Sequence, residues 1–89
     1  MVSKKIIIKN PSGLHARPAG VLAKEAAKCK SEVTIIDGDK QIKAKTILNI
    51  MSAAIKKGTE IELRCEGETE KEDLEKLSSM IESGLGEQI

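Results

Sequence analysis

The residues best suited to covalent chemistry are His15 and Arg17, which stand two positions apart in the segment GLHARPAG, residues 13–20. A neutral imidazole is a nucleophile near pH 7, and a guanidinium presents a fork of donors that fits phosphate oxygens. If a helix begins here, the amides of Ala16 and Arg17 lack intrahelical partners and attract anions. These groups together suit the acceptance of a phosphoryl group. The alternative, a loop histidine beside a solvated arginine, stays open on these residues alone.

The residues around the histidine predict how it is presented. Gly13 allows an unusual backbone angle, so that the ring can lie at the surface. Pro18 is tolerated only within the first turn of a helix, which places the helix start between Ala16 and Pro18. Apolar residues then recur at helical spacing as far as Lys28. The sequence therefore predicts an exposed imidazole at the N-terminal end of a helix.

The rest of the chain predicts the elements that must hold this helix. Period-2 alternation and turn residues indicate strands over Lys4–Lys9, 33–36, 41–44 and 60–66, with Asp37-Gly38-Asp39 as a hairpin turn. A short helix is expected from Thr46 or Ile47 to Lys56, capped by the Thr46 hydroxyl and ended by Gly58. A final helix is expected from a Thr69/Glu72 capping box to a stop at Gly84.

This order, β-α-β-β-α-β-α, predicts an α+β fold. We expect an open-faced two-layer sandwich in which a four-stranded antiparallel sheet carries three helices on one face, within a single domain over residues 1–89. The core must be aliphatic, because the chain has no Phe, Tyr or Trp. In the short helix we expect Ile47, Ile50, Met51 and Ala54 to be buried.

Composition excludes several functions. Fifteen basic and fourteen acidic residues give a net charge of +1, and aromatic stacking platforms are absent, which argues against nucleic-acid binding, RNA included. No apolar run approaches the roughly 20 residues that span a bilayer, and no secretion signal is evident, so we expect a cytoplasmic protein. One histidine and two cysteines cannot fill a dedicated tetrahedral zinc site without unusual help from carboxylates. We expect Cys29 and Cys65 to be buried thiols, although one disulfide is conceivable.

The segment GLHARPAG resembles the active-site signature of HPr, the histidine-containing phosphocarrier family of the bacterial phosphoenolpyruvate-dependent sugar phosphotransferase system. The resemblance covers the whole chain, including residues 45–48 (KTIL) and 51–54 (MSAA). It implies that enzyme I phosphorylates His15 on Nδ1 and that the group passes to enzyme IIA domains of sugar transporters. Arg17 and the amide of Ala16 would bind the phosphate. The resemblance implies a monomeric carrier without cofactor or metal, not an enzyme with its own turnover.

The resemblance also implies a regulatory site at Thr46, where many relatives carry a serine that an HPr kinase/phosphorylase phosphorylates. This chain departs from that pattern with a threonine, and with Asn49 where glycine is usual, so a purely structural cap remains an alternative. Leu48, Ile47, Met51 and Lys24 would form a docking surface for partners. Of these, Leu48 is expected to be exposed near His15.

A second hypothesis, of another class, is a regulatory module that acts with a catabolite-control regulator. Paralogues of that kind lack the active histidine. Because His15 is present, the phosphocarrier is the preferred interpretation.

Overall fold

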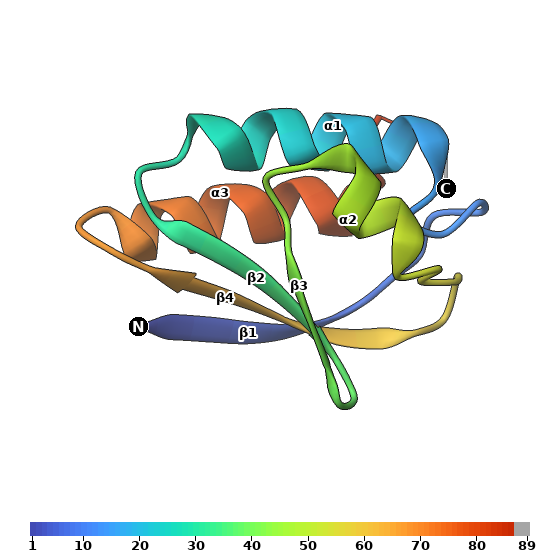
Figure 1. Cartoon of the computed structure of the whole chain (residues 1–89), viewed down its shortest axis with the longest axis horizontal. Coiled ribbons are helices and arrows are strands. Elements are labelled where there is room, and N and C mark those ends of the chain that lie inside the picture. The colour runs from blue at the N-terminus through green and yellow to red at the C-terminus, as the bar shows by residue number, and fades with distance from the viewer. Residues whose placement is uncertain (87–89) are drawn as a thin grey trace.

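The computed structural model describes residues 1–86 as four strands and three helices. In chain order they are β1 (Val2–Ile7), α1 (Ala16–Lys28), β2 (Glu32–Asp37), β3 (Lys40–Lys43), α2 (Ile47–Ser52), β4 (Glu60–Glu66) and α3 (Glu70–Glu82) (Figure 1). This is the predicted order β-α-β-β-α-β-α.

The strands form one antiparallel sheet in the order β1-β4-β2-β3. The central strand β4 pairs with β1 through Val2 and Cys65 and with β2 through Val33 and the same Cys65. All three helices lie over one face of the sheet, with α1 and α3 running side by side, and the opposite face carries no helix (Figure 1). The predicted open-faced two-layer sandwich is therefore confirmed.

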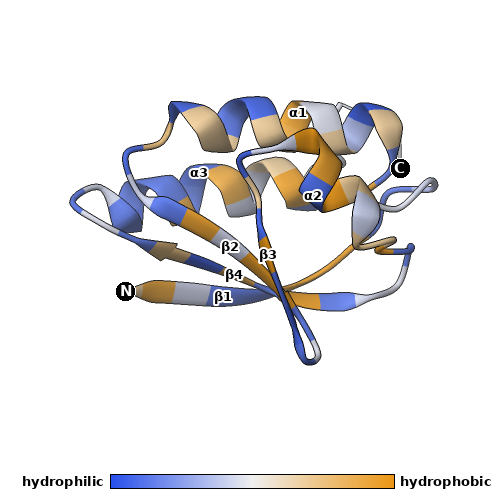
Figure 2. Ribbon diagram, in the orientation of Figure 1, coloured by the Kyte–Doolittle hydropathy of each residue, from blue (hydrophilic) through white to orange (hydrophobic). Residues whose placement is uncertain are grey.

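The core between the two layers is aliphatic. In β4, the buried residues Ile61, Leu63 and Cys65 alternate with half-buried or exposed polar ones, as the period of a half-buried strand requires. The colours of β2 in Figure 2 show the same alternation. From the helices, Leu22 and Leu77 add fully buried side chains. Both cysteines are free and buried, as predicted.

The short helix α2 ends at Ser52, so the prediction that it continues to Lys56 and stops at Gly58 was wrong. The chain leaves the helix because Ala54 adopts a left-handed backbone angle, φ = 52°. This turn places Ile55 in the core with 2% exposure. Continued helix would keep the amides and carbonyls of this segment in intrahelical bonds. Instead, the Ile55 carbonyl accepts a hydrogen bond from the Leu14 amide, and the Gly58 amide donates one to the Ile8 carbonyl. Both partners lie in the chain before α1.

The burial predicted for α2 was only partly right. Ile50 is fully buried and Met51 packs half-buried against the core, but Ile47 is 48% exposed and Ala54 is also exposed. The early end of the helix explains Ala54, whose place in the core is taken by Ala53 and Ile55.

The boundaries of three strands and the caps of two helices also differ from expectation. The first strand covers Val2–Ile7 rather than Lys4–Lys9, the second covers Glu32–Asp37 rather than 33–36, and the third covers Lys40–Lys43 rather than 41–44. Thr46 and Thr69 both occupy N-cap positions, but neither side chain makes the predicted cap hydrogen bond to the backbone. The Thr69 hydroxyl instead donates to Asp73 at 2.7 Å. No helix within residues 1–86 combines the length and apolar character needed to cross a bilayer.

Candidate functional site

His15 is the N-cap residue of α1, and its side chain is exposed. Its backbone is extended, with φ = −103° and ψ = 168°, and its carbonyl accepts the first helical bond from the Ala19 amide at 3.1 Å. The next residue, Ala16, has φ = 21°, an angle that L-residues rarely adopt. The imidazole therefore stands at the point where the loop becomes helix, beside the first-turn amides.

The loop before His15 is held by a close backbone approach at Gly13. This glycine has φ = 65°, and a Cβ atom there would lie 2.3 Å from the Ile55 carbonyl oxygen and 2.9 Å from the Lys56 Cα. No side chain fits in that space, so the position requires glycine. The Leu14 amide donates to the same Ile55 carbonyl at 2.9 Å, and the Leu14 side chain is buried. The histidine loop and the segment after α2 are thus joined directly.

A shallow hollow of about 300 Å³ lies at this junction. Two segments distant in sequence line it: Pro11, Ser12 and His15 from the loop, and Ala54, Ile55, Lys56 and Lys57 from the segment after α2. Lys56 and Lys57 were not predicted as site residues, because the sequence pattern places Lys56 at the end of the short helix and Lys57 just before its stop at Gly58. The adjacent pair of lysines followed by Gly58 was the only signal, and it carries no information about long-range placement.

Within residues 1–86, the charged side chains that line this hollow beside His15 are those of Lys56 and Lys57. Arg17 is exposed in the first turn of α1, although it is not among the residues that line the hollow. Within residues 1–86, no ion pair involves Arg17, Lys56 or Lys57, and no acidic side chain lines the hollow. The site is therefore suited to an anion. In the described part of the chain, no three metal-binding side chains gather.

An apolar surface on α2 lies next to α1. Leu48 is 75% exposed and Ile47 is 48% exposed. The Ile47 side chain reaches toward Gly20 of α1, where an added Cβ would lie 3.9 Å from Ile47 Cδ1. Thr46 is exposed at the helix N-cap, and Lys24 is exposed on α1. The exposure expected for Leu48 is confirmed, whereas the burial expected for Ile47 was wrong.

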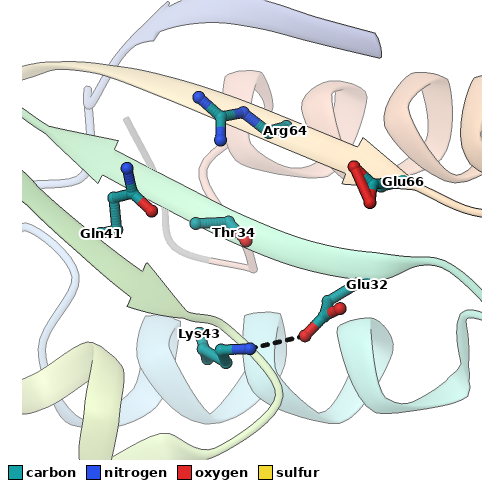
Figure 3. A pocket seen from close by; sticks show the side chains of 6 residues that line it. All are labelled: Glu32, Thr34, Gln41, Lys43, Arg64 and Glu66. Carbon is teal, nitrogen blue, oxygen red and sulfur yellow. Dashed lines mark hydrogen bonds and ion pairs between the residues drawn. The ribbon is translucent and has the colours of Figure 1, made fainter. Parts of the chain in front are cut away.

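A second hollow, of about 260 Å³, lies on the open face of the sheet and is lined by Glu32, Thr34, Gln41, Lys43, Arg64 and Glu66 (Figure 3). Lys43 Nζ and Glu32 Oε1 form an ion pair at 2.6 Å, which lowers the pKa of Glu32 and raises that of Lys43. Two basic and two acidic side chains balance here, and no imidazole lies among the lining residues. The surface at His15 is therefore the better candidate for anion chemistry.

Comparison with known proteins finds relatives that match nearly the whole chain. A family model described as "PTS HPr component phosphorylation site" matches residues 2–83. The phosphocarrier protein HPr of Mycoplasma capricolum is 44% identical over 86 residues, which cover 96% of this chain and 97% of that protein. The HPr-like protein Crh of Bacillus subtilis is 39% identical over 92% of this chain and 96% of its own length. The crystal structure of HPr-C-His from Thermoanaerobacter tengcongensis superposes with a TM-score of 0.94, at 38% identity and full coverage of both chains.

Proposed function

The chain belongs to the HPr family of phosphotransferase-system phosphocarriers, and on that basis we propose that His15 carries the phosphoryl group. Enzyme I, charged by phosphoenolpyruvate, would be the donor, and enzyme IIA domains of sugar transporters would be the acceptors. The observation that carries this proposal is the place of the only histidine, exposed at the N-cap of α1 beside a hollow in which residues 1–86 place no acidic side chain.

The transfer needs no metal or general base from this chain. The neutral imidazole Nδ1 attacks phosphorus, the bond between phosphorus and the donor breaks, and the ring keeps its proton on Nε2. The first-turn amides at Ala16 and Arg17, together with the Arg17 guanidinium, receive the phosphoryl oxygens. Reversal of the same step delivers the group to the next protein.

Binding at an exposed helix end suits a carrier because the phosphoryl group must leave again. The helix dipole contributes about 0.3–2 kcal/mol to an adjacent anion, which stabilises the phosphorylated form without making onward transfer strongly unfavourable. The precise alignment for transfer then comes from the partner protein. We therefore propose a monomeric covalent carrier that acts in the cytoplasm and has no turnover alone.

The exposed face of α2 is the proposed docking surface for these partners. Ile47 and Leu48 offer apolar area beside α1, Met51 supports them from the edge of the core, and Lys24 contributes a charge from α1. Apolar side chains that a small monomer leaves exposed together are typical of an interaction surface. One surface would serve donor and acceptors in turn, because all of them must reach the same histidine.

Thr46 gives this surface a proposed regulatory site. Its side chain is exposed directly before Ile47, and it makes no cap hydrogen bond, so its hydroxyl is accessible. Phosphorylation by an HPr kinase/phosphorylase would add a charge of about −2 next to Ile47 and Leu48 and would repel partners with acidic rims. A role with a catabolite-control regulator is a second candidate, which the similarity to the Crh protein of Bacillus subtilis favours.

The carrier function is tested by labelling the protein with enzyme I and isotopically labelled phosphoenolpyruvate. We expect one acid-labile phosphate per chain, and none in His15→Ala, because that substitution removes the only imidazole. Arg17→Glu should still fold, but it should accept the label at least tenfold more slowly, since a carboxylate then repels the phosphoryl oxygens.

Lys40→Glu is the matched control for the charge reversal, because Lys40 is also exposed but lies in the β2–β3 hairpin, away from His15. It should accept the label at the parental rate. If the unmodified protein takes no label while an authentic HPr does so in the same mixture, the carrier proposal fails. If Arg17→Glu accepts the label as fast as the Lys40→Glu control, Arg17 has no part in the transfer.

A further inference from the structure

We propose that Lys56 and Lys57 form a second cationic arm of the phosphate site and bind the oxygens of the phosphoryl group on His15. This inference rests on the proposed function, because it concerns the phosphorylated form of the same histidine. It adds two residues, which lie 41 and 42 positions after His15 in sequence, to the helix end and Arg17.

The backbone holds both lysines beside the histidine loop. The Ile55 carbonyl accepts the Leu14 amide at 2.9 Å, and the Gly58 amide donates to the Ile8 carbonyl at 2.7 Å. These two bonds fix the chain on either side of Lys56 and Lys57. The Lys56 backbone itself contacts the loop, since its Cα would lie 2.9 Å from a Cβ atom on residue 13. Both lysines line the hollow that His15 lines.

The charge of this segment has no partner in residues 1–86. Four other lysines, Lys4, Lys28, Lys43 and Lys76, each pair with a glutamate. Lys56 and Lys57 are exposed, form no ion pair, and share a hollow in which the described chain places no carboxylate. Two like charges held side by side without a counterion favour an incoming anion.

The phosphoryl group on His15 would be that anion. Its charge goes from about −1 to −2 as its last proton leaves, near pH 6 for a typical phosphate. Ammonium groups a few ångström away favour the dianion. With water-like screening, two of them should increase the acid dissociation constant of the phosphoryl group by about three- to tenfold.

This effect can be measured without any partner protein. Phosphoramidate phosphorylates the imidazole directly: the phosphorus–nitrogen bond of the reagent breaks, a new one forms to the ring, and ammonia leaves. Because His15 is the only histidine, the phosphohistidine signal in a ³¹P NMR titration reports this site alone. The double variant Lys56→Gln/Lys57→Gln should show an acid dissociation constant about three- to tenfold smaller than the parent, and the difference should shrink at high salt.

The matched control is Lys40→Gln/Lys71→Gln, which removes the same charge from two exposed lysines in β3 and at the start of α3. It should change the constant less than twofold. If the Lys56/Lys57 variant titrates like this control, the second cationic arm is refuted. That result would leave the carrier function intact, because labelling by enzyme I tests it separately. A folded parent that phosphoramidate cannot phosphorylate would overturn the inference as well, since His15 would then not be accessible.

Discussion

Single residues at the loop before α1 determine how the histidine is displayed. Gly13 provides a left-handed backbone and room for the Ile55 carbonyl, and Leu14 anchors the loop in the core. His15 and Ala16 then turn the chain into the helix, Ala16 with φ = 21°. Any side chain at residue 13 would collide with backbone atoms, so the position of the imidazole depends on this glycine.

Thr46 is the residue whose proposed modification can be tested most directly. We expect incubation with ATP and an HPr kinase/phosphorylase to add one phosphate, because the hydroxyl is exposed and unbonded at the N-cap of α2. Intact mass spectrometry measures the gain, and Thr46→Ala should show none. If the parent keeps its mass while a serine-containing HPr gains a phosphate in parallel, Thr46 has no regulatory role.

The motif residues could be predicted from sequence because they are local. Gly13, His15, Arg17 and Pro18 are close in the chain, and the effect of each on a helix start follows from its own chemistry. Lys56 and Lys57 could not be found in this way. Their place beside His15 depends on backbone bonds from Ile8 and Leu14, which connect residues far apart in sequence.

At the level of elements, two helices begin with threonines that have different environments. Thr69 donates to Asp73 at 2.7 Å, and the same carboxylate accepts the Ser31 hydroxyl at 2.6 Å and the Ser31 amide at 3.2 Å. Burial raises the pKa of Asp73, but these hydrogen bonds lower it more, so the net pKa lies below its usual value. The cluster joins the start of α3 to the loop between α1 and β2. Thr46 has no such contact.

This difference predicts unequal effects of the same substitution. Thr69→Ala should lower the free energy of unfolding by about 1–2 kcal/mol, because a part-buried hydrogen bond to a charged group is lost. Thr46→Ala should change it by less than about 0.5 kcal/mol. Urea denaturation of the two variants beside the parent measures both values. If both variants lost the same free energy of unfolding, the different environments described for Thr46 and Thr69 would be contradicted.

Strands and helices could be predicted where their apolar residues repeat with the spacing of that element. Alternation along β4 and the apolar stripes of α1 and α3 identified them correctly. The end of α2 could not be predicted, because the segment after Ser52 contains acceptable helix formers. It leaves the helix because of contacts with residues distant in sequence. Ile55 is buried, and its carbonyl is used by the histidine loop.

On the scale of the whole molecule, the reactivity of the two buried thiols shows whether the helices remain packed on the sheet. Cys65 is completely buried in β4, between Val2 of β1 and Val33 of β2. Burial, with a smaller contribution from the nearby Cys29, raises the pKa of Cys65 from 9.0 to about 11. At pH 8 Cys65 in the folded chain is therefore inaccessible to a reagent and very largely protonated.

Thiol labelling at pH 8 should therefore follow unfolding of the entire chain. Ile81→Val, which removes one methyl group from a fully buried side chain, should cost about 0.5–1.5 kcal/mol and speed the labelling of Cys65 roughly two- to tenfold. The rate of reaction with a chromogenic thiol reagent measures this. A Cys65 that reacts in the native protein as fast as in denaturant would show that the layers open locally.

The two-layer arrangement also separates Met1 from His15. The first residue lies at one end of the sandwich, and the loop before α1 lies at the other (Figure 1). The N-terminal amine pairs with Glu70 at 2.8 Å, a surface contact whose loss costs little. A tether attached at Met1 would consequently present the imidazole outward, so that the immobilised protein keeps its reactive end open to visiting molecules.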